Sequence, residues 1–251
     1  MGTPWDAQTY DRTSAPQQSW AADVLARLDG IAPDATVLDV GCGTGRVTET
    51  LLERVPRGRV LAIDASQEMV ALARARLGER ATVWCQSALE LELREQVDAV
   101  FSTATLHWVP EHDRLWATLA RALRPGGLLE AQCGGAGNIA RVREAIEHAA
   151  HARAPELIGF CPWVFATPAE TETRLAKAGF GAIRCWLERR PTYPDDVGEF
   201  VRTSILAAHL QRLAPARRDA FARAVTERVR PPLDYVRLNV SAVRRRGPPI
   251  R

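Results

Sequence analysis

The chain has 251 residues, of which 46% are hydrophobic and 25% charged, a composition that is ordinary for a globular protein. A formal net charge of +3 is too small to indicate binding to nucleic acid, and no apolar run approaches the ~18 residues of a membrane span. The five cysteines are odd in number and lack the paired spacing of metal ligands, so we expect no metal site and reduced thiols. We therefore expect a single domain over residues 1–251 and a cytoplasmic location.

The first predicted element is a helix over residues 18–28, where apolar side chains recur at helical spacing. A short strand follows, rich in β-branched residues and containing Asp39. It leads into a turn with Gly41, Gly43 and Gly45, and helix-compatible sequence begins at Arg46. Glycine permits positive φ and lets a ligand approach the backbone. This order of strand, tight turn and helix is typical of a site for a nucleotide-like ligand.

The charges around this turn favour one ligand over another. The dinucleotide pattern ends in a further glycine, and Arg46 stands in its place. A carboxylate at Asp39 would repel a pyrophosphate but attract an ammonium group. The next predicted strand, residues 59–63, ends in Asp64, where an acid is expected to bind both ribose hydroxyls. S-adenosyl-L-methionine, which has an ammonium and no phosphate, fits best; a nicotinamide-dependent oxidoreductase is the alternative.

The elements that follow supply further candidate ligands of this cofactor. Ala65 comes directly after the second acid, and a helix over 68–77 carries Met69 in its first turn, where the thioether would pack against the adenine. A third strand over 81–85 leads to Ser87 and Ala88. A fourth strand, 97–101, leads to Ser102. We expect all of these residues to contact the cofactor.

The loop after the fourth strand is expected to lie beside the transferred group, because ligands of such sheets bind at the carboxyl ends of the strands. It contains His107 and Trp108. His107 is the candidate catalytic residue and Trp108 a candidate substrate contact. A structural histidine is the alternative.

The second half of the chain reads as two insertions and the rest of the sheet. A helix over 111–123 and a strand over 128–133 come first. Asn138 is positioned to cap a helix over 139–153, and a helix over 168–178 is followed by strands over 181–190 and 235–246. The insertions, 138–165 and 191–232, are expected to cover the substrate. The first contains an aromatic cluster over 155–165 that indicates a wall of the substrate pocket, with packing in a satellite core as the alternative. The second is too long for a simple connection and should form a small helical cap over the active site. Candidate substrate residues in the cap are Phe160, Trp163, Phe165, Tyr193, Glu199 and Arg202.

The run from Asp39 to Gly45, with Asp64 after it, resembles the first motif of class I S-adenosylmethionine-dependent methyltransferases. Residues 5–7 and Tyr10, 106–109, and 235–238 resemble the trans-aconitate methyltransferase branch. The resemblance implies an α/β, Rossmann-like fold: a seven-stranded sheet, mostly parallel with an antiparallel last strand, with helices on both faces.

The same resemblance implies a role for each segment of the chain. It implies a cofactor-binding core over 31–135, a final strand over 233–246 and an N-terminal lid over 1–30, with Tyr10 covering the methionine end of the cofactor. The family usually has an acid that bonds the adenine amino group where this chain has Ser87.

Three acceptors of the methyl group remain open at this stage. A small carboxylic acid, as the branch suggests, needs no general base, only a cation or hydroxyl to orient it. A prenyl diphosphate would need aromatic faces for a carbocation, a base such as His107 or Glu199, and arginines. A natural-product hydroxyl would need His107 as its base. A catalytically inactive cofactor-binding module is a further alternative.

Overall fold

The computed structural model describes residues 15–93 and 96–246, with side chains from Trp20 onward. The expectation for Tyr10 and for residues 5–7 therefore lies outside the described residues. Helix α2 (Ala15–Leu25) and a short 3-10 turn (Ala26–Leu28) begin the described chain. Trp20, Val24 and Leu28 are buried, which confirms the apolar face predicted for this segment.

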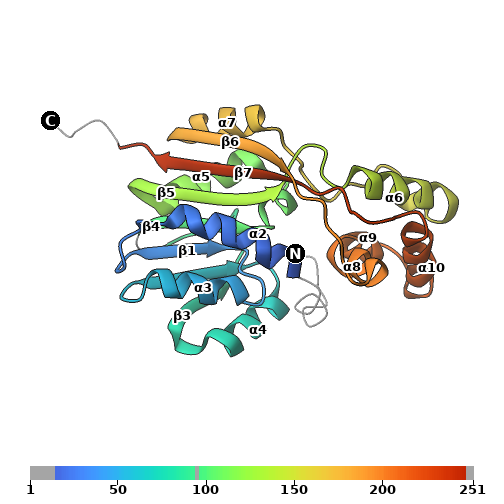
Figure 1. Cartoon of the computed structure of the whole chain (residues 1–251), viewed down its shortest axis with the longest axis horizontal. Helices are drawn as coiled ribbons and strands as arrows, with labels where there is room; N and C mark the ends of the chain where they lie inside the picture. Colours follow the sequence, from blue (N-terminus) through green and yellow to red (C-terminus); the bar gives the residue numbers. More distant parts are fainter. Residues whose placement is uncertain (1–14, 94–95, 247–251) are drawn as a thin grey trace.

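A seven-stranded sheet with the order β3-β2-β1-β4-β5-β7-β6 forms the centre of the protein (Figure 1). The first five strands pair in parallel, and β7 is antiparallel to both β5 and β6. This is the predicted arrangement, including the antiparallel last strand. The strands are β1 (Thr36–Val40), β2 (Arg59–Asp64), β3 (Ala81–Cys85), β4 (Val97–Thr103), β5 (Leu123–Gly134), β6 (Phe180–Arg189) and β7 (Val236–Arg244).

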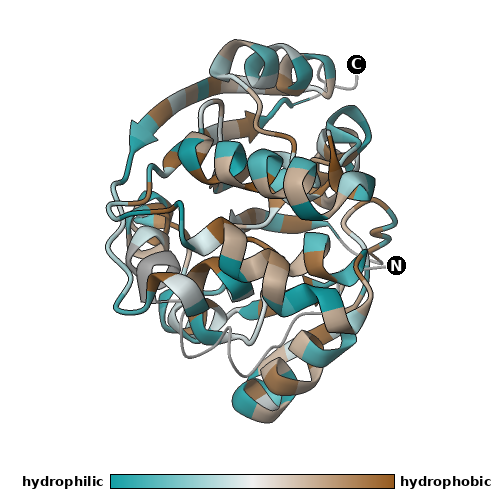
Figure 2. Ribbon diagram, turned by 90° about the vertical axis from the view of Figure 1, so that its right-hand side faces the viewer, coloured by the Kyte–Doolittle hydropathy of each residue, from teal (hydrophilic) through white to brown (hydrophobic). Residues whose placement is uncertain are grey.

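Helices cover both faces of the sheet. On one face, α2, α3 (Arg46–Arg54) and α4 (Gln67–Leu77) bury residues such as Leu51 and Val70 against β1, β2 and β3. On the other face, α5 (His112–Ala122) and α7 (Pro168–Lys177) pack through Leu115 and Leu175 against β4, β5 and β7. The helices carry both hydrophilic and hydrophobic stretches (Figure 2), as amphipathic surface helices do.

The two predicted insertions form a second apolar core beyond the carboxyl ends of β1 and β5 (Figure 1). Phe200, Phe221 and Leu157 are among its fully buried members. Segments far apart in the sequence therefore fold into one cap, which consists of α6 (Ala140–Arg153), α8 (Val197–Ser204), α9 (Ala207–Gln211), α10 (Pro215–Thr226) and the loop over 154–167.

Two local expectations are corrected. Asn138 does not cap α6: its side-chain oxygen accepts a hydrogen bond from the backbone N–H of Val236 (2.9 Å), and Ile139 precedes the helix in a left-handed conformation. Strand β5 begins at Leu123, five residues earlier than expected, with a register shift against β4 between Val97 and Ala99.

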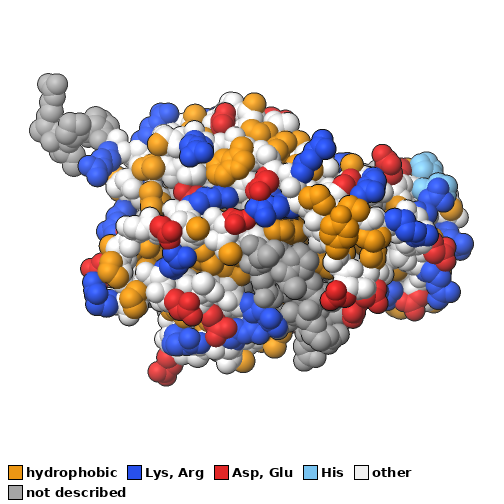
Figure 3. Space-filling model, in the orientation of Figure 1, with side chains coloured by type: hydrophobic (Ala, Val, Ile, Leu, Met, Phe, Trp, Pro, Cys, Tyr) orange, Lys and Arg blue, Asp and Glu red, His pale blue; other side chains and the backbone are white. Residues whose placement is uncertain are grey.

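The surface charges are mixed, with basic and acidic side chains interspersed over the visible face (Figure 3). Among the described residues, no helix combines the length and apolarity that crossing a membrane requires.

Candidate active site

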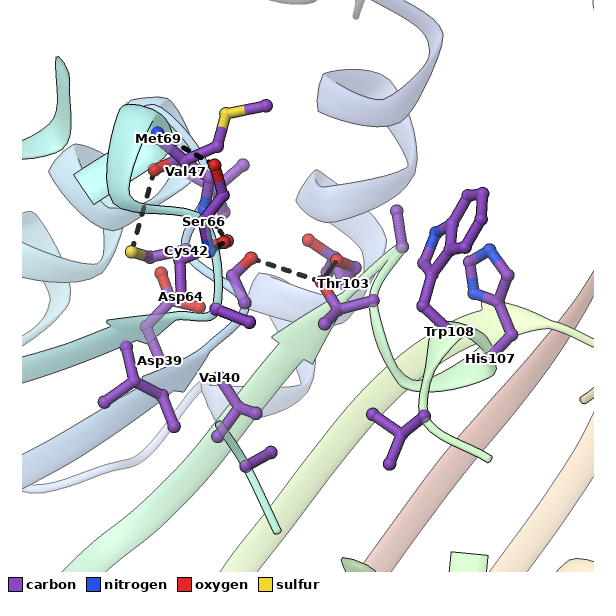
Figure 4. Close-up of a pocket in the computed structure, with 18 of the residues that line it drawn as sticks. Asp39, Val40, Cys42, Val47, Asp64, Ser66, Met69, Thr103, His107 and Trp108 are labelled. Carbon is purple, nitrogen blue, oxygen red and sulfur yellow. Dashed lines mark hydrogen bonds between the residues drawn. The ribbon is translucent and has the colours of Figure 1, made fainter. Parts of the chain in front are cut away.

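A cavity of about 370 Å³ lies at the carboxyl ends of β1, β2 and β4, where the cap meets the sheet. Figure 4 shows its two sides, with Asp39, Asp64 and Met69 on one and His107 and Trp108 on the other. Ten of the sequence-predicted residues line it: Asp39, Gly41, Gly43, Asp64, Ala65, Met69, Ser87, Ala88, His107 and Trp108.

The glycine turn has the conformation that its sequence indicates. Gly41 has φ of 77°, and a Cβ there would overlap the side chain of Thr105. Gly43 has φ of 55° and no heavy atom near the position of a Cβ, so its backbone is open to a ligand. Gly45 differs, because it does not line the cavity. It begins α3, and a Cβ there would lie 3.0 Å from Leu77 of α4, so its role is helix packing.

The two predicted acids both face this turn. Asp39 is 2% exposed, and its Oδ2 accepts a hydrogen bond from the Thr48 hydroxyl at 2.7 Å. Asp64 accepts backbone N–H groups through both oxygens, from Gly43 at 2.9 Å and from Ser66 at 2.8 Å. Each carboxylate oxygen has two lone pairs, so these bonds fix Asp64 in place and leave it able to accept from a ligand.

Burial changes the acid–base behaviour of both carboxyl groups. It raises the pKa of Asp39 to about 7, an effect that the Thr48 hydrogen bond reduces and the negative charge of Asp64 increases. Burial also raises the pKa of Asp64, whereas hydrogen bonds from Ser66 and Gly43 oppose that rise. Two acids in a poorly hydrated recess make this end of the cavity attractive to a cation.

The other predicted cofactor residues divide into two groups. Met69 is buried in the first turn of α4, whose N-cap is Ser66 as expected. The Ser87 hydroxyl oxygen accepts from the N–H of Leu89 at 3.2 Å, and its hydrogen can still donate. Ser102 is a correction: it is fully buried away from the cavity and donates to the Val40 carbonyl at 2.7 Å, joining β4 to β1.

His107 lies on the cavity wall, but its hydrogen bonding does not suit a general base. The backbone N–H of Gly134 donates to its Nδ1 at 3.3 Å, so Nδ1 must be the accepting nitrogen. Burial, with Arg237 and His112 nearby, lowers its pKa well below the usual value, so the ring is neutral. In a neutral ring with Nδ1 accepting, Nε2 carries the hydrogen. His107 is therefore a hydrogen-bond donor to the cavity.

The predicted aromatic wall lies behind the cavity. Trp163 and Phe165 stack with an interplanar angle of 9°, and they contact Trp108 and His107 at centroid distances of 5.5 and 5.7 Å. They support the two lining residues from the cap side without lining the cavity themselves. Phe160 lies further away, next to His209. The prediction that these three side chains contact substrate is not supported, because they belong to the cap core.

The three polar residues predicted in the cap also lie off the cavity. Tyr193 is 70% exposed. Glu199 is exposed in the first turn of α8. Arg202 forms an ion pair with Asp219 of α10 at 2.7 Å. Residue type and position after a strand could not reveal which way these side chains turn in a helical cap.

Four residues that sequence reasoning did not select line the end of the cavity opposite the acids: Trp20, Ser204, Tyr235 and Arg237. Tyr235 and Arg237 were part of the resemblance at 235–238, and that was the available signal. Polar side chains alternate with apolar ones along β7, and Arg237 belongs to the polar face. Helix α2 covers that face, however, and Arg237 is only 1% exposed.

The position of Arg237 is fixed by its neighbours. Its Nε donates to Oε1 of Gln132 on β5 at 3.4 Å, and its guanidinium lies 4.5 Å from the centre of the Trp20 ring. Gln132 is itself held by Asn239, to which it donates at 2.9 Å. Trp20 and Tyr235 are in ring contact at 5.0 Å. The buried Arg237 thus lines the cavity at the end opposite Asp39 and Asp64.

Comparison with known proteins decides what this cavity belongs to. A methyltransferase domain family matches residues 37–127. The trans-aconitate 2-methyltransferase of Acidovorax ebreus is 30% identical over 233 residues, which are 84% of this chain and 90% of that protein. The chain belongs to the class I S-adenosylmethionine-dependent methyltransferases, in the trans-aconitate methyltransferase branch. It is therefore an enzyme of methyl transfer, and its cofactor is S-adenosyl-L-methionine.

Further matches agree with this membership. The trans-aconitate 2-methyltransferase of Methylobacterium nodulans is 34% identical over 183 residues, covering 73% of this chain and 67% of that protein. Alignments with several relatives of the same name cover about half of each. Phosphoethanolamine N-methyltransferase 2 of Haemonchus contortus, solved with S-adenosylhomocysteine, has a TM-score of 0.66 at 18% identity. It covers 96% of this chain and 57% of that protein, and shows the fold alone.

The residues at the acid end fit this cofactor. Asp39 and Asp64 provide negative charge for a cationic ligand, and the open backbone at Gly43 leaves room for it. No pyrophosphate is involved, so Arg46 can occupy the position where a dinucleotide site has glycine. Among the described residues, no cluster of three or more histidine, cysteine or acidic side chains is arranged to hold a metal ion.

Proposed function

We propose that this methyltransferase transfers the methyl group of S-adenosylmethionine to a carboxylate oxygen of a small organic acid. The observation that carries the proposal is Arg237, a buried arginine that lines the cavity opposite the cofactor acids. Arginine binds carboxylates through a planar fork of N–H donors. The names of the relatives, which refer to trans-aconitate, support an acid acceptor.

The proposed reaction mainly requires the protein to align the cofactor's methyl group with the carboxylate oxygen. The sulfonium of the cofactor supplies an activated methyl group, and a carboxylate is nucleophilic without losing a proton. Arg237 would hold the carboxylate, while Nε2–H of His107 would donate to it and orient one oxygen. Holding the reacting groups in line is the main source of rate enhancement in such a step.

The two other acceptors are less well supported. A hydroxyl acceptor needs a base, and His107 has its accepting nitrogen occupied by Gly134. A prenyl diphosphate needs several cations near its phosphates, yet Arg202 is paired with Asp219 and Arg212 lies over Phe160, both away from the cavity. A carboxylate requires a cation and a hydrogen-bond donor, and among the described residues Arg237 and His107 line the cavity and can supply them.

The test is the chemical stability of the methylated product. The purified full chain is incubated with cofactor labelled on its methyl group and with a set of small carboxylic acids, hydroxy compounds and prenyl diphosphates. We expect a product from the acids that releases labelled methanol in mild base, as a methyl ester does. A product that is stable to base would mean ether or carbon methylation and would refute the proposal.

A cytoplasmic location remains a prediction, supported by five cysteines that are all free thiols.

A further inference from the structure

A layer of polar side chains lies between strands β5 and β7 and the segment that covers them. Gln132 of β5 is the cross-strand partner of Asn239 in β7, and both side chains are fully buried. Arg237 precedes Asn239 by two residues, so it lies on the same face of β7. The covering segment contacts the layer twice: the Arg237 guanidinium lies over the ring of Trp20 in α2, and Arg27 of the 3-10 turn after α2 donates to Asn239. This polar layer therefore connects the covering segment to the acceptor end of the cavity.

Stability alone does not account for such a layer. Buried amides are costly unless they are hydrogen-bonded, and apolar side chains of the same size would stabilise the fold about as well. The opposite face of the same two strands is packed in that way, with Cys133, Leu238 and Val240 in the apolar core. A fully connected polar network instead holds its members in one arrangement. We therefore expect the polar layer to fix the position of a side chain that matters for function.

The hydrogen bonds of the polar layer give each amide a defined orientation. Oδ1 of Asn239 accepts from Arg27 and from Nε2 of Gln132, the latter at 2.9 Å. Oε1 of Gln132 points the other way and accepts from Nε of Arg237 at 3.4 Å. The amide nitrogen of Asn239 donates to Glu188 on β6, also at 3.4 Å. Both amides thus use their oxygen and their nitrogen.

The cationic side chains at the two ends select this orientation. A guanidinium can only donate hydrogen bonds, so Arg27 requires the oxygen of Asn239 and not its nitrogen. The nitrogen of Gln132 then faces that oxygen, which leaves the oxygen of Gln132 for Arg237. If either amide were reversed, two donors would meet. The contact of Arg27 with Asn239 therefore places a hydrogen-bond acceptor at Nε of Arg237 through two intervening side chains.

We propose that Gln132 and Asn239 are positioning residues for the methyl acceptor, and that Arg27 completes their network from the 3-10 turn after α2. A guanidinium binds a carboxylate in its own plane, and the bond to Gln132 sets the direction of that plane in Arg237. Neither amide lines the cavity, and Arg27 does not line it either, so all three act through Arg237. This inference rests on the proposed carboxyl methylation, in which Arg237 holds the acid.

The first test is Asn239→Leu, which removes the central amide and keeps a side chain of similar size. Kinetics are measured on the full chain at saturating S-adenosylmethionine, with trans-aconitate or, if the screen above shows a faster acid, with that acid. We expect the KM for the acid to rise about fivefold, the effect of losing one neutral hydrogen bond, with kcat changed by less than about twofold. The affinity for S-adenosylhomocysteine should not change. An unaltered KM would overturn the inference.

Ser241→Ala is the matched control. Ser241 lies two residues beyond Asn239 on the same face of β7, and its hydroxyl donates to its cross-strand partner Glu130 at 2.6 Å. Loss of this bond should lower the melting temperature and leave the KM for the acid unchanged. A KM raised as much by Ser241→Ala as by Asn239→Leu would mean that any loss of polar packing on this face weakens acceptor binding, and the inference would fall.

A double-mutant cycle shows whether Asn239 acts through Arg237. In the Arg237→Leu background, we expect Asn239→Leu to cause no further rise in KM. A second rise of about the same size there would indicate a general structural role and would overturn the inference. If Arg237→Leu alone left the KM unchanged, the proposed function would lose its anchor for the acid. That failure is recognised without any variant of Asn239.

Variants of Arg27 keep the inference testable if Asn239→Leu does not fold, because the Arg27 side chain is 18% exposed at the border of the polar layer. Arg27→Met removes the cation that orients both amides, whereas Arg27→Lys retains a donor for Asn239. We expect Arg27→Met to raise the KM for the acid about two- to threefold, less than Asn239→Leu, since Gln132 still donates to Asn239. Arg27→Lys should have a KM near the wild-type value. The same KM in both Arg27 variants would overturn the inference.

Discussion

The two ends of the cavity differ in how the chain builds them. The cofactor end comes mainly from one continuous stretch, in which Asp39, the glycine turn and Asp64 follow each other through two adjacent strands. The acceptor end brings together Trp20, Ser204 and Arg237, which are far apart in the sequence and come from α2, α8 and β7. One end is local in sequence, and the other exists only after the cap and α2 have packed on the sheet.

Because of this difference, we expect substitutions to have different effects at the two ends of the cavity. A local motif positions its groups through backbone conformation, so a single added atom can disrupt it. The acceptor end positions its groups through side-chain contacts, such as Gln132 with Arg237, so a substitution there should change binding of one ligand and leave the other end unaffected. Four substitutions test this contrast.

The largest effect is expected from Gly41→Ala. The added Cβ would overlap Thr105, and alanine is disfavoured at φ of 77°. We expect destabilisation of about 2 kcal/mol or more, seen in thermal unfolding, together with loss of S-adenosylhomocysteine binding. Gly30→Ala is the matched control, because Gly30 also has positive φ (92°) but no heavy atom near the Cβ position. Equal effects of both substitutions would show that the contact with Thr105 is unimportant.

Asp64→Ala is expected to weaken cofactor binding by about 1–3 kcal/mol, because two ribose hydroxyls and two backbone N–H groups lose a charged acceptor. Calorimetry with S-adenosylhomocysteine measures this change. At saturating cofactor, the KM for the acid should stay near the wild-type value, since Asp64 lies at the opposite end from Arg237. An unchanged dissociation constant would remove Asp64 from the site.

Arg237→Leu should act on the other end. We expect the KM for the acid to rise about tenfold, at the lower end of the range for a charged hydrogen bond, with an unchanged affinity for S-adenosylhomocysteine. Arg202→Leu removes an arginine that is paired with Asp219 on the cap, and it should leave both values unchanged. If both variants raised the KM equally, the acceptor would be held by the cap and not by β7.

The smallest effect is expected from Asp39→Asn in the protein without ligand. Burial raises the pKa of Asp39 to about 7 from 3.8, so the folded state binds this proton more tightly than the unfolded chain does. Stability from this group is therefore present at low pH and lost as the pH rises toward 7. We expect Asp39→Asn to increase the free energy of unfolding at pH 8 by on the order of 1 kcal/mol, which a higher melting temperature would show. At pH 4 we expect little effect.

The same substitution should weaken cofactor binding at pH 8, where the ionised Asp39 attracts the ammonium group. In the wild type, the affinity should therefore increase as the pH rises through 7. A variant that melts below the wild type at pH 8 would show that the Thr48 hydrogen bond outweighs the burial cost.

The sequence predicted the fold and the cofactor end well because both follow local rules. Alternating glycines require positive φ, and acids at the ends of adjacent parallel strands meet at one edge. The sequence pattern did not distinguish residues that line the cavity from residues that only support those that do. Gly45 and Ser102 stand in the same short segments as lining residues, yet one packs a helix and the other joins two strands.

The acceptor end could not be predicted for a different reason. Which side chains reach the cavity depends on how α8 and α2 pack, and this is not encoded in spacing along one segment. Aromatic density indicated that residues 155–165 are more than a solvated loop, and Trp163 is buried there, but Trp163 and Phe165 pack behind His107 and Trp108. Arg237 lies in a strand in which polar and apolar residues alternate. The strand's polar face is covered by α2, which the spacing of residues did not indicate.

The most direct test of a cavity with two opposed charged ends is a crystal structure of the protein with S-adenosylhomocysteine and an acid bound together. The account predicts the ribose hydroxyls on Asp64, the carboxylate on the guanidinium of Arg237, and the acid's body between Trp20 and Tyr235. An acid bound at the cap surface near Tyr193 or Arg202, with Arg237 making no contact to it, would contradict the account.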